Sequence, residues 1–312
     1  MGQKSLALIF TGYGAQHQGM LRNLQNLPDV NLELTRLLDA AEGLSELQLT
    51  KIAESGPDNL LAEPRVAFPL LFIADYLWAH YARGVGMRPQ VMAGHDVGEY
   101  AALAHAGVLS TTSALDLVVR LSRLLEEGAR DSDGATLVIL GLPVADVRKF
   151  LASNSSQGQV WVSCDNSADQ VIIGGVQSVL EALMPGLQSV GARQVLLSPH
   201  RGAFNTPLVS KAADRYRGIL GQTELRDAKI PVIMNATAQV ATGSSEFLEP
   251  LASQVTHTIR WRETMDHIAA HAPVICVESG PGSTLSDLND TDEGIEYYSL
   301  AQSGIIKLLN RL

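Results

Sequence analysis

Residues 94–98 combine two glycines with a histidine and an aspartate, in the order Gly-His-Asp-Val-Gly. The preceding stretch 89–93 (PQVMA) predicts a short strand, and the following stretch 99–107 (EYAALAHAG) predicts a helix that ends at its glycine. A strand, a tight G-x-x-x-G turn and a helix form the geometry of a nucleophile elbow. The turn would present Asp96 at the helix N-terminus, where backbone N–H groups and the helix dipole favour negative charge.

Asp96 has two interpretations when it is considered alone. An aspartate before a helix is commonly a cap, which accepts hydrogen bonds from the N–H groups two and three residues on. A carboxylate at the tip of an elbow can also act as a general base or as a nucleophile. The G-x-D-x-G pattern does not decide between the two, so the decision depends on the rest of the chain.

Composition predicts a large α/β protein and excludes several classes of function. The chain has 312 residues, is 46% hydrophobic and carries a net charge of −10, which argues against a general nucleic-acid binder. No apolar stretch has the length of a membrane span, so we expect no membrane partner. Cys164 and Cys276 lie in apolar runs, which is typical of buried reduced thiols. We expect a cytoplasmic protein that uses no cofactor and no metal.

The order of predicted elements indicates two parts. Residues 134–198 read as strand, helix, strand, strand, helix and strand, which is the ferredoxin-like order. We predict an α/β fold: an α/β-hydrolase-like parallel sheet domain (1–133 and 199–312) with an inserted ferredoxin-like subdomain (134–198). The large domain is expected to contain strands 5–10, 89–93, 230–234 and 273–278 and helices 66–84, 113–128, 207–220 and 262–271.

Six motifs in order carry a family resemblance: FTGYGAQHQGM, GHDVGEYAALAHAGVLS, AFNTPLV, VIMNATA, TIRWRETM and VESGPGSTLSDL. Together they resemble the motifs of the malonyl-CoA:acyl-carrier-protein transacylases and polyketide synthase acyltransferases. The resemblance covers essentially the whole chain. It implies acyl thioesters as substrates in polyketide or fatty-acid biosynthesis. The implied partners are an acyl carrier protein with a phosphopantetheine-bound acyl group, or acyl-CoA, with polyketide synthase modules as a further class.

The departures from the family pattern fall on the residues that would do chemistry. The family's nucleophilic serine is replaced by Asp96, and its catalytic histidine by Asn205. Its arginine for the malonyl carboxylate falls on Leu121, and the glutamine of its glycine-rich loop falls on Tyr13. Without an arginine fork a substrate carboxylate loses its bidentate partner, so we expect no malonyl specificity.

Other parts of the implied site are retained. The resemblance implies an oxyanion hole made by the backbone N–H groups of Val97 and Tyr13, and His95 stays beside the elbow. It also implies a substrate pocket that includes Leu121, Gly12 and Phe204, which the leucine would make apolar. Arg120 and Arg123 flank the leucine, but neighbouring helix positions point elsewhere.

Three hypotheses follow, and whether the chain is an enzyme stays open. In the first, Asp96 processes acyl thioesters, as a base on water or through a mixed anhydride, with His200 as the candidate to activate water, although an ordinary surface-loop histidine is the favoured interpretation of His200. In the second, Asp96 is an internal anion in a pseudoenzyme that binds a carrier protein or a synthase. In the third, Ser122, Ser198 or Ser210 rescues transfer, although none lies on an elbow. We favour the first, because a drifting elbow more often becomes alanine or glycine.

A basic stretch is the candidate docking surface for a carrier. Arg201, Lys211, Arg215 and Arg217 lie on and before the predicted helix 207–220. A basic rim would steer an acidic carrier protein or a phosphate group towards the site. The alternative is an ordinary solvated helix face.

Overall fold

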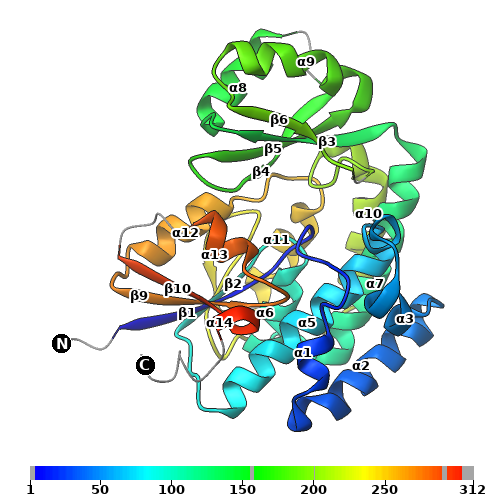
Figure 1. Ribbon diagram of the computed structural model, residues 1–312, viewed down its shortest axis with the longest axis vertical. Coiled ribbons are helices and arrows are strands. Elements are labelled where there is room, and N and C mark those ends of the chain that lie inside the picture. Colours follow the sequence, from blue (N-terminus) through cyan, green and yellow to red (C-terminus); the bar gives the residue numbers. More distant parts are fainter. Residues whose placement is uncertain (1–3, 155–157, 200, 290–293, 304–312) are drawn as a thin grey trace.

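The structure is a computed structural model that describes residues 4–154, 158–199, 201–289 and 294–303. Figure 1 shows two parts, a larger one with most of the helices and a smaller one above it. The strands are β1 (Ser5–Phe10), β2 (Val91–Gly94), β3 (Gly134–Leu140), β4 (Val160–Asp165), β5 (Gln170–Val176), β6 (Gln194–Leu197), β7 (Val232–Ile233), β8 (Val240–Ala241), β9 (Val274–Ser279) and β10 (Ile295–Ser299).

Helices follow most of these strands. They are α1 (Arg22–Gln25), α2 (Pro28–Ser45), α3 (Leu49–Ser55), α4 (Asp58–Leu61), α5 (Pro64–Gly84), α6 (Gly98–Ala106), α7 (Thr111–Asp131), α8 (Val144–Ser153), α9 (Gln177–Ser189), α10 (Ser210–Leu220), α11 (Leu248–Gln254), α12 (Trp261–Ala269), α13 (Thr284–Leu288) and α14 (Leu300–Ser303). Two short 3₁₀ turns span Pro207–Val209 and Ser244–Glu246. No helix within the described ranges is both long enough and apolar enough to cross a membrane.

The large sheet confirms the predicted parallel α/β fold. Within the described residues its strand order is β10-β9-β1-β2-β7-β8, and all neighbours are parallel except β7 and β8. The central strand β1 is buried on both faces, as strands of parallel sheets are. Its alternate residues Leu6, Leu8 and Phe10 face the core shared with α2, α5, α6 and α7, while Ala7 and Ile9 face α12 and α13.

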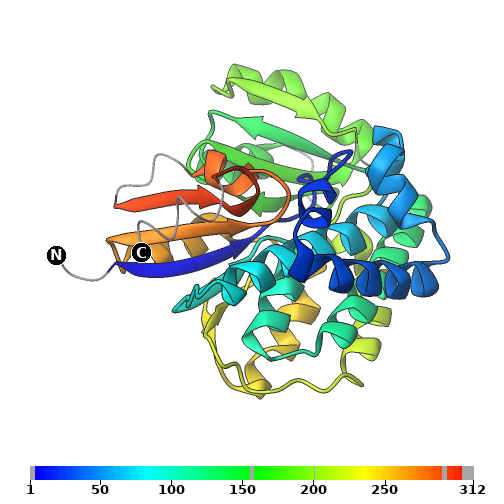
Figure 2. The ribbon, with the colours of Figure 1, turned by 60° about the horizontal axis from the view of Figure 1, so that its bottom comes forward.

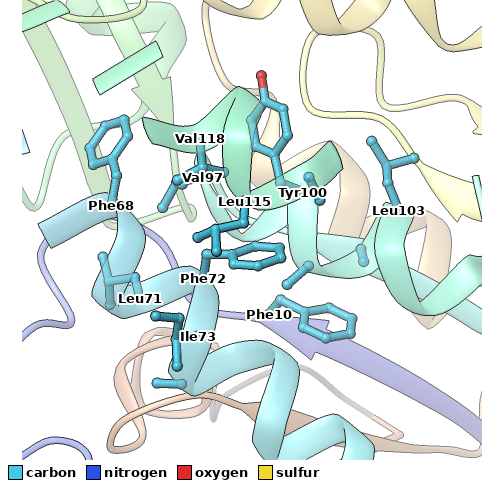
Figure 3. Close-up of a cluster of buried hydrophobic side chains, with 14 of the residues drawn as sticks. Phe10, Phe68, Leu71, Phe72, Ile73, Val97, Tyr100, Leu103, Leu115 and Val118 are labelled. Atoms are coloured by element: carbon cyan, nitrogen blue, oxygen red, sulfur yellow. The ribbon is translucent and has the colours of Figure 1, made fainter. Parts of the chain in front are cut away.

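The helical layer on one face of this sheet supports the elbow. Helices α2, α5 and α7 lie together on this side in Figure 2, and all three contact one another. Figure 3 shows side chains of α5, α6 and α7 meeting Phe10 of β1 in a dense apolar cluster. Val97, at the start of α6, belongs to this cluster and is 1% exposed. The residue after Asp96 is therefore anchored in the core.

The smaller part is a separate antiparallel sheet in the order β6-β3-β5-β4. Its helices α8 and α9 cover the face that points away from the large sheet (Figure 1). This order and the chain sequence β-α-β-β-α-β are those of a ferredoxin-like fold, as the sequence predicts. The domain boundaries 134–198 stay a prediction.

Strand β4 joins the two parts close to the elbow. The N–H of Asp165 donates to the Ile259 carbonyl at 2.9 Å, and the N–H of Ile259 donates to the Ser163 carbonyl at 2.9 Å. The buried Asp165 carboxylate also pairs with Arg262 of α12 at 3.1 Å. The Asp165 carboxylate is buried, so removal of the Arg262 guanidinium would leave its negative charge uncompensated.

The structure contains elements that the sequence predictions did not include or placed differently. Helices α1–α4 fill residues 22–61, for which no element was predicted. The predicted strand 230–234 is only the two residues Val232–Ile233, and the predicted helix 113–128 extends over Thr111–Asp131. The short β7 is the point where the parallel sheet ends and the antiparallel edge strand β8 begins.

The packing at the elbow predicts a sharp contrast between two glycine substitutions. A Cβ at Gly98 would lie 2.2 Å from the Thr11 carbonyl oxygen, whereas a Cβ at Gly218 of α10 meets nothing within 4 Å. Gly98→Ala should lower the free energy of unfolding by about 3 kcal/mol or more, because the obstructing atom is backbone. Gly218→Ala, the matched control, should raise it by about 0.4–1 kcal/mol. Urea unfolding curves measure both, and equal stabilities for the two variants would contradict the tight elbow.

Candidate functional site

The turn between β2 and α6 holds Asp96 in a left-handed backbone conformation. Its φ is 51°, which is uncommon for a residue with a side chain, although aspartate tolerates it better than most. The turn is tight because its flanking residues are glycines: a Cβ at Gly94 would lie 2.2 Å from the Glu99 nitrogen. Strained positions of this kind occur at functional sites, where surrounding structure holds them.

The Asp96 carboxylate already has hydrogen-bond donors on it. It accepts hydrogen bonds from the backbone N–H groups of Val97 and Tyr13, and from the side chain of Asn205. Burial raises the pKa of Asp96 above its ordinary value, while the neighbouring His95 and these hydrogen bonds oppose the rise. The side chain is only partly exposed. The two backbone donors that the resemblance assigns to an oxyanion hole are thus engaged by this protein's own carboxylate.

Asn205 reaches the same carboxylate from the loop before α10. Its backbone also has a positive φ, 56°, and its Nδ2 donates to the Gln254 carbonyl at 3.0 Å. The amide NH₂ has two N–H bonds, so it can serve Asp96 and Gln254 together. The Gln254 side chain in turn donates from Nε2 to the Asp96 carbonyl at 3.0 Å. Asp96 and Asn205 are therefore fixed by a shared set of hydrogen bonds.

His95 connects the elbow to the smaller sheet. Its Nε2 lies 2.9 Å from Asn166 Oδ1, and Asn166 Nδ2 donates to Gln170 Oε1 at 2.8 Å. The bond to Gln170 orients the Asn166 amide so that its Oδ1 faces His95 and accepts a hydrogen bond. The imidazole proton is therefore on Nε2, and Nδ1 is unprotonated. Burial lowers the pKa of His95, with Asn166 and Asp96 opposing the change. The ring packs edge-on against Trp261, at 5.3 Å between centroids.

Leu121 is enclosed by the main core. It is 4% exposed and belongs to the main core. The flanking arginines are engaged elsewhere: Arg120 pairs with Asp116 at 2.8 Å, and Arg123 donates to the Leu44 carbonyl at 2.5 Å. Neither therefore replaces the family's arginine. Both side chains lie on exposed helix surface, as their positions on a helix predict.

A cleft of about 630 Å³ opens between the elbow, α13 and the smaller sheet. Among the described residues that line it, Gly12, Tyr13 and His95 belong to the candidate site, and Asp96 is not one of them. The remaining lining residues are Gly14, Val138, Leu140, Asn166, Ser167, Asp169, Gln170, Ile172, Thr284, Leu285, Asp287 and Leu288. A mostly apolar cleft with a few amide groups is typical of a site for a small molecule or a cofactor arm.

Residues 7–296 match the family described as the acyl transferase domain. The chain belongs to this family. It is 30% identical to the malonyl CoA-acyl carrier protein transacylase of Salmonella typhimurium, with 90% of this chain and 91% of that protein covered. It is 28% identical to the enzyme of the same name from Bacillus subtilis, over 91% of this chain and 89% of the relative.

Solved structures agree with this assignment. The malonyl CoA-acyl carrier protein transacylase of Coxiella burnetii superposes with a TM-score of 0.91 at 28% identity, covering 99% of this chain and 98% of the other. A malonyl-transacylase solved in complex with its type II polyketide synthase acyl-carrier protein gives the same TM-score at 26% identity, covering 99% of this chain and 100% of the other. The acyltransferase fold therefore persists here around a changed elbow.

The sequence analysis also proposed His200, a basic rim and a substitute serine for this site. His200 lies outside the described residues. Arg215 pairs with Glu127 and Arg217 with Glu249, both at 2.5 Å, so two of the four residues of the predicted basic rim have carboxylate partners on the protein itself. Ser122 is fully buried and donates to a backbone carbonyl, which removes it as a substitute nucleophile.

Glu99, on the first turn of α6, is a site residue that the sequence analysis did not select. It is fully buried, and its Oε1 accepts from the Asn235 N–H at 2.6 Å. Its Oε2 has no hydrogen-bond partner among the described residues. Burial raises the pKa of Glu99 to about 8, with Asp96 adding to the rise. The sequence shows that Glu99 lies three residues after Asp96, but it does not show that the Glu99 side chain is buried, which is what raises its pKa.

Glu99 predicts a pH-dependent difference between the protein and its Glu99→Gln variant. The folded protein keeps the carboxyl protonated up to about pH 8, while the unfolded chain releases the proton near pH 4.5. Rising pH in this window therefore favours unfolding of the protein, by about 1.4 kcal/mol per pH unit, and glutamine cannot ionise. Urea unfolding at pH 5 and pH 8 should show the variant gaining a few kcal/mol on the protein. A difference that stays constant between the two pH values would refute the raised pKa.

Proposed function

We propose that this acyltransferase-family protein binds the phosphopantetheine arm of an acyl carrier protein, or of CoA, in fatty-acid or polyketide biosynthesis, without forming an acyl-enzyme at residue 96. The relatives support the partner and the pathway: they are named malonyl CoA-acyl carrier protein transacylases. One structural neighbour is a complex with its acyl-carrier protein. The elbow supports the loss of the transfer step.

The engagement of the Asp96 carboxylate is the observation that carries this proposal. Acyl transfer requires donors aimed at the place where negative charge develops on the thioester oxygen. Here the N–H groups of Val97 and Tyr13 already donate to a carboxylate, and the Asn205 amide adds a further donor. A thioester oxygen would have to displace this internal anion, which loses several charge-assisted hydrogen bonds. Under this proposal the Asp96 carboxylate takes the place where the oxyanion would form.

The lack of a base for a hydroxyl nucleophile and of a partner for a substrate carboxylate also supports the loss of acyl transfer. A hydroxyl nucleophile needs a base, and the amide of Asn205 spends its N–H bonds on Asp96 and Gln254 rather than accepting a proton. Attack by Asp96 itself would give a mixed anhydride, which water cleaves readily. No arginine of α7 within the described residues stands free to hold a substrate carboxylate, because Arg120, Arg123 and Arg130 have partners.

The cleft suits a pantetheine arm. The arm carries two amides along a flexible chain with a branched apolar segment, so it needs amide partners between apolar walls. Asn166 and Gln170 offer amides, and Val138, Ile172 and Leu285 offer apolar surface. The thiol end would then arrive beside Gly12, Tyr13 and His95, next to the elbow.

A second candidate function is hydrolysis of acyl thioesters with Asp96 as the base. The observation in its favour is that Asp96 stays partly exposed and has a raised pKa, both of which suit a general base. It ranks second because the same carboxylate would have to leave the oxyanion donors in order to activate water.

A mass and turnover experiment separates these functions. The protein is incubated with malonyl-CoA, acetyl-CoA and the corresponding acyl carrier thioesters, and both protein mass and thioester are followed. We expect no acyl adduct, no consumption above the buffer rate, and measurable binding of the holo carrier protein. Asp96→Asn, which removes the charge and keeps the shape, should also bind. Consumption that is lost in Asp96→Asn would establish hydrolysis instead, since a base contributes roughly a hundred- to ten-thousand-fold.

Restoration of transfer should require three changes together. Asp96→Ser supplies a hydroxyl, Asn205→His a base and Leu121→Arg a partner for the malonyl carboxylate. The triple variant should gain malonyl transfer from CoA to a carrier protein, at least about a hundredfold above Asp96→Ser alone. The matched control carries Ala at position 96 with the other two changes, and it should stay inactive. Efficient transfer by Asp96→Ser alone would show that Asn205 and Leu121 are not losses.

A further inference from the structure

Tyr13 stands where the resemblance places the family's glutamine, in the glycine-rich loop directly beside the elbow. Its backbone N–H is on the Asp96 carboxylate, so its side chain necessarily begins within the site. The ring continues into the apolar layer beneath the loop rather than into solvent, since it packs against the main core. Tyr13 also lines the cleft, so one side of the residue borders the open space.

Within the part of the chain that the structure describes, contacts from separate segments hold the Tyr13 side chain in place. The ring meets Phe68 of α5 edge-on at 5.4 Å and Phe204 of the loop before α10 at 6.0 Å. The hydroxyl donates to the Ala62 carbonyl. Burial and the nearby Asp96 and Glu63 raise the pKa of Tyr13, so the phenol stays neutral and keeps its proton for this bond. Edge-to-face pairs of this kind hold a ring orientation beyond simple area burial.

The side chains around the space that would receive an acyl group are themselves buried. The resemblance places an acyl group between residue 96, Phe204 and Leu121. Phe204 is 8% exposed, Leu121 is 4% exposed, and Phe68 is 1% exposed. The cleft opens over Gly12, Tyr13, His95 and the smaller sheet.

We infer that the Tyr13 ring is a plug that determines which form of the arm the site accepts. It occupies the space beside residue 96 into which an acyl chain would extend, so the cleft accepts the free thiol or an acyl group of two or three carbons and rejects longer acyl chains. This inference rests on the proposed function for the identity of the ligand. The position of the ring rests on the contacts of Tyr13, and the position of the acyl space rests on the family resemblance.

The plug makes the site selective for an unloaded arm over a loaded one, a selectivity that acyl transfer does not require. A binder that rejects loaded arms distinguishes an unloaded carrier protein from one that carries a growing chain. Each CH₂ that could be buried would otherwise strengthen binding about fourfold. The affinity for a loaded arm therefore lacks this increase for every acyl carbon that the Tyr13 ring excludes.

The test compares the protein with Tyr13→Ala and Tyr13→Phe. The probes are pantetheine and its acetyl and hexanoyl derivatives, with NH in place of the thioester sulfur so that nothing is consumed. Isothermal titration should give similar affinities for pantetheine and the acetyl probe on the protein, and affinity at least about tenfold lower for the hexanoyl probe. Tyr13→Ala should bind the hexanoyl probe about tenfold more tightly than the protein does. Tyr13→Phe keeps the ring and should keep the rejection.

A second measurement needs no pantetheine. Apolar cavities of about 150 Å³ bind benzene-sized molecules, so Tyr13→Ala should accept p-cresol, the side chain that it lacks. The melting temperature of Tyr13→Ala should rise with p-cresol concentration, while that of the protein and of Tyr13→Phe should not. Absence of a selective rise would show that the ring fills no separable space and would overturn the inference.

The two measurements distinguish the failure of each proposal. If pantetheine binds and the acyl chain length makes no difference in either protein or variant, the plug is wrong and carrier binding stands. If no pantetheine probe binds but p-cresol stabilises Tyr13→Ala selectively, the proposed function is wrong and the ring still fills the acyl space. If neither effect is seen, both are wrong.

Discussion

The hydrogen bonds that converge on the Asp96 carboxylate are the constraint on which the rest of the site depends. They join the Val97 N–H of α6, the Tyr13 N–H of the loop after β1, and the Asn205 amide of the loop before α10. A charge in a partly buried position is costly unless donors and dipoles compensate it. The donors therefore have to be held in place, and the surrounding elements do this.

Each of those elements is fixed by its own buried anchor. Val97 lies in the apolar cluster between α5, α6 and α7. The loop after β1 is held from below, since the Thr11 hydroxyl donates to Asp75 Oδ1 at 2.6 Å and burial raises the pKa of that carboxyl well above its ordinary value. Asn205 is tied to Gln254 of α11. Rigid supports of this kind favour a fixed arrangement over one that rearranges around a reacting group.

Several acidic side chains are buried beneath the elbow, and they affect which charges the site can accept. Burial raises the pKa of Asp75, Asp96, Glu99 and Glu278, although Glu278 also accepts N–H bonds from Leu285 and Ser286. Burial disfavours the charged form of these groups, and it would disfavour a substrate carboxylate in the same place, since the described arginines of α7 all have partners. The electrostatics of the site therefore agree with binding of a neutral arm end better than with transfer of a malonyl group.

The sequence by itself determined the periodic parts of this protein. The aliphatic run of β1, the glycines at 94 and 98, and the β-α-β-β-α-β order all predicted elements that the structure contains, because period and turn chemistry are local properties. Helix α2 was missed although Val30, Leu34 and Leu38 have helical spacing and are buried. Only tertiary structure decided the site. Asn205 meets Asp96 across distant sequence, the ring of Tyr13 fills the acyl space, and Glu99 keeps its proton, because hydrogen-bond partners and burial arise from packing between elements.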